Sequence, residues 1–506
     1  VPNLGRAVAD VQRIVTTQAA QSPELRQWLQ TQFPDFEKAA KHVGGIGEYL
    51  GEEIVVSFEP RCRGFCGVFI ADVNRPGLKE YLQKEMPAGA PVLVTDLANL
   101  PAVPSDRMYV ALTGNRVFVG AEPAFIRQAA AGNSKFAQTS FGQAVGEVYR
   151  RGAGVLVAAN VGSVIERENT PGSVFSALGI DGMRHLIAEQ RELGGKTTYS
   201  AVVTFDGQRR GVASWLAEPG SMGGLGFVSR DALFATAWVV KNPAQMLEDA
   251  LTLTRLTSRE ELNVGEFEAR TGVKLEDVAQ ALGSEVVFAL DGPMVPTPAW
   301  KAVLEVKDSA KLQTAISKMV ATANQSMPAG TAPIELTDGK LEDKQQGAQN
   351  MVAYKLSYPG GKMAEAHYAY VDGYMVIAST EAFLQRAIVD RRAGVSLSRS
   401  QEFRRLLPGG EHLNPSGIVY QNAGEVIRLM AKGAAEAAGN DAERQKRIEE
   451  LAGNVEAGLV AVYGSADRIE VASQGSALNL LSQTLAGQMF GGPQSRGTTR
   501  SPRSYR

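Results

Sequence analysis

The chain has 506 residues, of which 44% are hydrophobic and 21% charged, an ordinary globular composition with enough apolar residues for a large core. Its 52 basic and 54 acidic residues leave a formal net charge of -2, so no excess of positive charge points to nucleic acid or to anionic lipid as a partner. No apolar run reaches the roughly 18 to 20 residues that cross a bilayer. We therefore expect no transmembrane segment in this chain and no nucleic acid among its partners.

Residues 1–216 are predicted to form a first α+β repeat. They begin with a helix that Asn3 is placed to cap, with apolar residues recurring on one face. The same pattern returns later behind a strand-like run, ALFATAWVV at 232–240, where Asn242 is the cap and Pro243 stands in the first turn. Because no strand precedes the first helix, we expect one more strand upstream in the precursor, and before it a signal peptide or membrane anchor.

The two cysteines, Cys62 and Cys66, are separated by three residues and lie between two strand-like runs. A disulfide between them would close a hairpin loop and would imply an oxidising compartment. Two free thiols are the alternative. A metal half-site is disfavoured because the four histidines show no ligand spacing to one another or to the cysteines. We predict neither a metal nor a cofactor.

Residues 230–490 are predicted to form a second α+β repeat that matches the first segment by segment. Leu50 corresponds to Leu282, and each precedes a glycine that ends a helix and begins a strand. Asn74 and Asp308 are each placed as a cap between a strand and a helix. A turn with the sequence MPAGAP in the first repeat returns as MPAGTAP in the second.

The most informative pair of segments is 108–130 and 367–388, each a β-hairpin that leads into an amphipathic helix. In the second, Asp-Gly at 372–373 stands between two alternating runs, a strong signal for a tight hairpin. Ser379 or Thr380 is placed to cap the helix. The predicted buried face of that helix consists of Phe383, Leu384, Ala387 and Ile388.

The remaining matches complete both repeats. Asn160 and Asn422 are each predicted to cap a helix after a strand, and residues 212–214 correspond to 471–473 as the last strand of a closing hairpin. Residues 217–229, rich in glycine, are predicted to be a linker, since these glycines precede a strand and do not open a helix after one, as a nucleotide loop would. The tail 491–506, basic and poor in apolar residues, is predicted to be disordered or docked on a partner.

Strands joined by tight turns and interleaved with one-sided helices predict an α+β fold, with two tandem copies of an antiparallel sheet covered by helices on one face. The less covered face is then the place for function. Two interpretations of its tyrosines stay open: they hold a hydrophobic ligand or a partner protein, or they pack under the helices with their hydroxyls at the edge. The tyrosines concerned are Tyr354, Tyr358, Tyr368 and Tyr370.

Catalytic patterns are missing from the sequence. It contains no GxSxG, HExxH or P-loop motif, and four histidines offer little general-base capacity near neutral pH. We therefore expect a protein that is not an enzyme.

Several segments resemble a family of bacterial envelope proteins defined only as a domain of unknown function. They are AVLEVKDSAKL, AWVVKNPAQML, ALDGPMVPTPAW and DGYMVIASTEAFLQRAI. The resemblance implies an exported or membrane-anchored protein in the periplasm or cell envelope, and it brings no catalytic residues.

The leading hypothesis is a non-enzymatic exported scaffold or binding protein, a peripheral subunit of a membrane-associated complex. The alternatives are a carrier that holds a lipid or pigment between sheet and helices, and a hydrolase with a dispersed site.

Overall fold

The computed structural model describes residues 44–474 except 60–66, 86–90, 104–106, 169–172, 258–262, 294–297, 342–350, 359–364, 409–413, 423, 426–427 and 429–456. The predicted N-terminal helix, Cys62, Cys66 and the tail 491–506 lie outside the described residues. The chain divides into two compact units, Val1–Leu156 and Val157–Arg506. The expected division at 217–229 therefore falls inside the larger unit.

Over its described residues, the smaller unit contains a five-stranded sheet in the order β1-β2-β5-β4-β3, in which β3 and β4 are parallel and the other neighbours are antiparallel. Its strands are β1 (Leu50–Phe58), β2 (Gly67–Val73), β3 (Val92–Val94), β4 (Tyr109–Thr113) and β5 (Arg116–Gly120). Its helices are α4 (Leu78–Glu85), α5 (Pro123–Ala131), α6 (Ser140–Arg150) and the 3-10 turns η1 (Leu97–Asn99) and η2 (Phe136–Gln138).

Helices cover both faces of this sheet. Val110 of β4 packs with Leu82 of α4, whereas the next residue, Ala111, packs with Ile126 of α5. Because successive residues of a strand point to opposite faces, α4 and α5 lie on opposite sides of the sheet.

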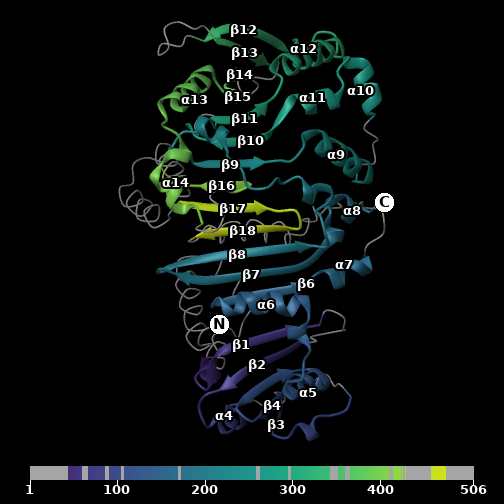
Figure 1. The fold of residues 1–506 in the computed structure, drawn as a ribbon, viewed down its shortest axis with the longest axis vertical. Helices are drawn as coiled ribbons and strands as arrows, with labels where there is room; N and C mark the ends of the chain where they lie inside the picture. Colours follow the sequence, from purple (N-terminus) through teal and green to yellow (C-terminus); the bar gives the residue numbers. More distant parts are fainter. Residues whose placement is uncertain are drawn as a thin grey trace, which may run out of the picture. The chain divides into compact units, whose positions relative to one another are not determined.

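The larger unit contains a thirteen-stranded sheet, counted over the described residues, in the order β12-β13-β14-β15-β11-β10-β9-β16-β17-β18-β8-β7-β6 (Figure 1). In that order the strands are Glu335–Leu341, Met351–Ser357, Glu365–Val371, Tyr374–Ala378, Trp300–Val306, Leu282–Leu290, Phe234–Val239, Gly417–Gln421, Gly458–Gly464, Arg468–Gln474, Lys196–Phe205, Met183–Leu193 and Val155–Asn160.

The described helices of the larger unit connect these strands. The α-helices are α7 (Gly162–Glu168), α8 (Val174–Leu178), α9 (Pro243–Thr257), α10 (Val264–Thr271), α11 (Leu275–Ala281), α12 (Ser309–Gln325), α13 (Glu381–Ala393) and α14 (Gln401–Leu406). The 3-10 turns are η3 (Ile180–Gly182), η4 (Gly211–Ser214), η5 (Gly223–Phe227) and η6 (Leu397–Arg399).

The predicted α+β class is confirmed. The prediction that helices cover only one face of the sheet is wrong for the large sheet, as it is for the small one. Tyr368 of β14 packs with Leu312 of α12, while the adjacent Ala369 packs with Leu384 of α13. The strands are apolar at consecutive positions, so both faces require cover.

The hairpin prediction at 372–373 is confirmed in detail. Val371 pairs with Tyr374, and the two turn residues have φ angles of 49° and 82°, as a two-residue turn of type I′ requires. Thr380 caps α13 by accepting a hydrogen bond from the N–H of Phe383. Leu384, Ala387 and Ile388 are buried. The predicted caps Asp308 and Asn422 likewise accept backbone N–H groups, from Lys311 and Glu425.

The closing hairpin of the first repeat differs from the prediction. Residues 212–214 belong to η4, and the hairpin is instead β7–β8, which turns between Leu193 and Lys196. The buried Arg209 explains the difference, because its guanidinium donates hydrogen bonds to the carbonyls of Ala213, Leu216 and Ser465. β8 pairs with β18, so strands assigned to the two predicted repeats lie in one sheet.

The two sheets share an order of strands. β1-β2-β5-β4 in the smaller unit parallels β10-β11-β15-β14 in the larger one, whereas the next strands differ, since β3 is parallel to β4 and β13 is antiparallel to β14. The pairing of β1 with β2 shifts register between Leu50 and Ile54, and that of β10 with β11 shifts between Leu282 and Val286. Both shifts follow the Leu-Gly pairs that correspond in sequence.

Candidate functional site

Three of the four predicted tyrosines form one cluster. The rings of Tyr354 and Tyr368 are stacked with centroids 5.0 Å apart. The hydroxyls of Tyr368 and Tyr370 donate hydrogen bonds to Oε1 of Gln313 on α12, at 3.0 and 3.2 Å. Burial raises the pKa of both phenols. Tyr358 stands apart after β13 and is exposed.

This arrangement matches the second interpretation from the sequence, in which the rings pack under a helix with satisfied hydroxyls. Tyr368 is only 2% exposed. A ligand could reach its ring only if α12 moved, so the cluster is not an open binding face in this structure.

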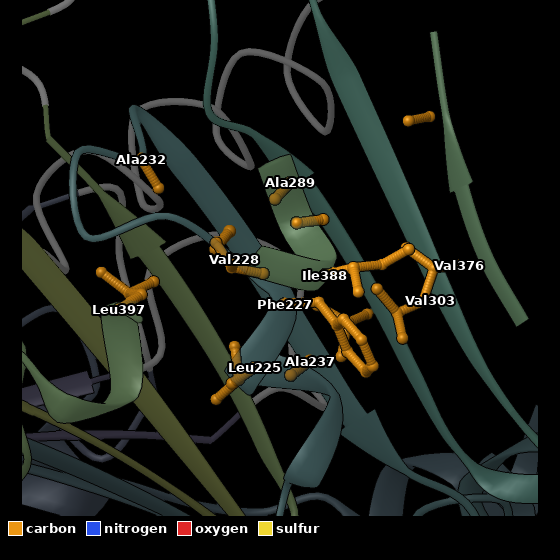
Figure 2. Close-up of a cluster of buried hydrophobic side chains, with 14 of the residues drawn as sticks. Leu225, Phe227, Val228, Ala232, Ala237, Ala289, Val303, Val376, Ile388 and Leu397 are labelled. Carbon is orange, nitrogen blue, oxygen red and sulfur yellow. The ribbon is translucent and has the colours of Figure 1, made fainter. Parts of the chain in front are cut away.

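The glycine-rich segment predicted as a linker is packed into the core of the larger unit. Leu225, Phe227 and Val228 are buried against residues of the central strands and of α13. Figure 2 shows the side chains of Phe227, Val303 and Ile388 gathered in this cluster. The apolar residues between and after the glycines are the signal in the sequence for this burial.

Four charged side chains hold the backbone of this segment. Glu285 accepts the N–H of Gly224 at 2.6 Å, and Asp291 accepts the N–H of Ser229 at 2.9 Å. In addition, the guanidinium of Arg391 donates to the carbonyl of Gly223 at 2.7 Å, and the ammonium of Lys301 donates to that of Phe227 at 3.2 Å. We call these four residues the clamp. Buried backbone groups need such partners, so the clamp allows an irregular segment to lie in the core.

The charged groups of the clamp also interact with one another and with neighbouring aromatic side chains. Lys301 and Asp291 form a buried ion pair of 2.6 Å. The guanidinium carbon of Arg391 lies 4.3 Å from the centroid of the Phe227 ring, a cation–π geometry. Tyr374 donates its hydroxyl hydrogen to Glu285 at 2.9 Å.

Burial raises the pKa values of Glu285 and Tyr374, since it penalises the charged form of each. Perturbed groups of this kind often mark active sites, but here Glu285 accepts the N–H of Gly224 and the hydroxyl of Tyr374, so both groups are engaged within the core. We therefore assign the clamp a structural role.

The described parts of the chain contain neither a candidate metal site nor a candidate membrane-spanning helix. No group of three or more His, Cys, Asp or Glu side chains there could hold a metal ion. Likewise, none of the helices in those parts combines the length and apolarity needed to cross a membrane.

The candidate binding site is the outer edge of β1. Among the described residues, β1 ends its sheet and pairs only with β2. The side chains of Val55 and Val56 are 44% and 46% exposed, although they point to opposite faces, and Phe58 is 63% exposed. The backbone N–H and C=O groups along the edge of a terminal strand are a template for another strand, and exposed apolar side chains on both faces add contact area for it.

The other terminal strand with a described sequence of similar length, β12, is built differently. Its exposed positions include Glu335, Asp338 and Lys340. Charges on an edge strand discourage further pairing. In β1 the charges are confined to Glu52 and Glu53 near its start, and Glu53 accepts a hydrogen bond from the hydroxyl of Tyr149 on α6. The second half of β1, residues 54–58, therefore has no charged side chain that would discourage pairing with another strand.

No family model, curated protein or solved structure matches the chain.

Proposed function

We propose that this chain is a non-enzymatic scaffold or binding protein, exported to the cell envelope and acting as a peripheral subunit of a membrane-associated complex. The observation that carries the proposal is the second half of β1, residues 54–58, which is uncharged and mostly apolar. Extended segments commonly bind by adding a strand to such an edge, with main-chain hydrogen bonds giving affinity.

The proposal includes an origin by duplication, with one α+β unit used twice. The common strand order and the matching register shifts of β1 and β10 support it. A duplicated framework leaves one copy free to diverge. The exposed strand belongs to the copy that lacks the complete clamp. In that copy Glu53 stands at the position of Glu285, but Val68 stands at the position of Lys301.

The test is a native pull-down from membranes of the source organism. Wild-type protein with an affinity tag should recover a partner at a defined stoichiometry, and Val56→Lys should lose it. Val352→Lys is the matched control, because Val352 is 47% exposed but lies in β13, which is paired on both sides. Recovery of wild-type protein alone and monomeric contradicts the proposal.

A further inference from the structure

The helices α13 and α14 and the turn η6 between them cover one face of the large sheet. Ile388 of α13, Leu397 of η6 and Phe403 of α14 are buried in one cluster, and Figure 2 shows the first two of these side chains in it. The same cluster includes Ala369 of β14 and Ala461 of β17. A series of directly paired residues on the strands between them joins these two alanines, so both point to the same face. The polar sides of the three elements therefore belong to one surface of the larger unit.

This surface is rich in arginine. Residues 381–406, which span α13, η6 and α14, contain six arginines, no lysine and three acidic residues. The helices α11 and α12 pack on the opposite face, and they contain two lysines, two acidic residues and no arginine. The formal net charge of -2 for the whole chain therefore conceals a local excess of positive charge on one face.

Three arginines at the end of this segment are exposed, namely Arg399 on η6 and Arg404 and Arg405 on α14. We call them the arginine patch. The Nε of Arg404 donates a hydrogen bond to the carbonyl of Ser398 at 3.2 Å, which holds its side chain against the turn that carries Arg399. Within the described parts of the chain, the three arginines form no ion pair with a carboxylate. Their charges are therefore available to an external anion.

Arg386 and Arg391 of α13 differ, since their charges are already engaged within the protein. Arg386 lies 3.8 Å from Asp231 and 3.5 Å from Asp390. Arg391 belongs to the clamp and lies 3.0 Å from Asp372. The surface available to an anion is thus centred on η6 and α14.

The surroundings of the arginine patch indicate which anion fits. Exposed guanidinium groups favour phosphate, because their planar N–H donors match two phosphate oxygens. A Cβ at Gly394 would stand 2.8 Å from a terminal nitrogen of Arg399, so this guanidinium lies against Gly394, and the next residue, Val395, is 42% exposed. Basic and apolar side chains bind together at the headgroup level of a membrane, so the apolar neighbour favours lipid over nucleic acid. The tail 491–506, with four arginines and no acidic residue, can meet the same surface.

We infer that the arginine patch binds the phosphate groups of anionic lipids at a membrane surface. The inference rests on the proposed function, which places the protein at a membrane, and adds to it a direct attachment to lipid. The protein then has two separate contacts, a partner protein at β1 and lipid headgroups at η6 and α14.

Sedimentation with vesicles measures binding of the full chain. Vesicles of phosphatidylcholine with about one third phosphatidylglycerol present anionic headgroups, and vesicles of phosphatidylcholine alone are the neutral reference. The patch variant combines Arg399→Gln, Arg404→Gln and Arg405→Gln. Because these side chains are exposed, the variant should keep the fold, which circular dichroism checks.

The matched control removes three exposed positive charges from α10 and α12 by combining Arg270→Gln, Lys311→Gln and Lys318→Gln. The helix α12 lies on the opposite face of the sheet. Lys318 donates a hydrogen bond to the carbonyl of Gly272 directly after α10, so α10 accompanies α12. The control therefore changes the net charge equally and leaves the arginine patch intact.

The expected result is binding of the wild type to the anionic vesicles only, weakening as salt screens the exposed charges. The patch variant should bind at least about tenfold more weakly, and the control within about twofold of the wild type. Hydrogen exchange of the wild type with anionic vesicles should be slower at residues 394–406. That measurement does not depend on the folding of any variant.

Four outcomes overturn the inference: no preference for anionic vesicles, equal losses in the two variants, unchanged exchange at 394–406, or a labelled DNA duplex that binds the patch as tightly as the vesicles do. If vesicle binding fails while the native pull-down still recovers a partner, the proposed function survives and the protein is attached through that partner alone. If vesicles bind and the pull-down recovers only monomer, the scaffold role falls and the lipid contact stands.

Discussion

Replacing Lys301 by Met tests whether the clamp is as important to stability as its geometry indicates. The side chains of Lys301 and Asp291, which form an ion pair, are 1% and 0% exposed. The ammonium of Lys301 also donates a hydrogen bond to the carbonyl of Phe227. Lys301→Met leaves Asp291 charged, buried and without its counter-ion. Breaking a buried pair in this way costs about 3 to 5 kcal/mol of unfolding free energy.

A second change should reverse most of this loss. In the double variant Lys301→Met, Asp291→Asn the amide oxygen can still accept the N–H of Ser229, and no charge remains buried. Neutral replacement of a buried pair is often tolerated, so we expect stability within about 2 kcal/mol of the wild type.

Urea unfolding followed by tryptophan fluorescence is the assay, because Trp215, Trp238 and Trp300 all belong to the larger unit. Lys311→Met is the matched control. Lys311 pairs with Asp277 at 3.4 Å, but these side chains are 44% and 51% exposed, so its loss should cost under about 1 kcal/mol. A loss this small for Lys301→Met, or a double variant no more stable than the single one, would refute the reasoning.

Two further predictions concern the same segment. Burial raises the pKa of Glu285 above its ordinary 4.5, so the folded state binds this proton more tightly than the unfolded state. The resulting stabilisation is complete below about pH 4.5 and is lost as pH rises through the folded pKa. The unfolding free energy of Glu285→Gln should therefore increase relative to the wild type toward neutral pH in urea titrations, and parallel curves would contradict this. Gly224→Ala places a Cβ 2.9 Å from both Oε1 of Glu285 and Cγ2 of Val287 and should cost about 1 to 3 kcal/mol in the same assay. Gly339→Ala, with open space around the added Cβ, should cost nothing measurable, and equal losses for the two would count against the close approach.

The exposed edge of β1 and the buried clamp show how the two parts differ despite their common order of strands. In the larger unit, β9 and the glycine-rich segment cover the positions around Val287. In the smaller unit the corresponding Val55 is exposed. The asymmetry between the predicted copies is thus located at this strand, and the proposed binding follows from it.

Features that depend on neighbours in the chain could be predicted from the amino-acid sequence. The Asp-Gly turn, the Thr380 cap and the buried face of α13 each involve residues within a few positions of one another, so backbone conformation and periodicity were sufficient. For the tyrosine cluster, the period-two spacing of the tyrosines could be read from the sequence, whereas their burial under α12 could not.

Features that depend on distant parts of the chain required the folded structure. The pairing of β8 with β18 and the capture of the glycine-rich segment by Glu285, Lys301 and Arg391 join residues separated by many elements. A segment of glycines and apolar residues is compatible with a linker or with a core insertion, and only the partners available for its buried backbone groups distinguish the two. The exposure of β1 is of the same kind, since a strand's own sequence does not specify whether another strand lies beside it.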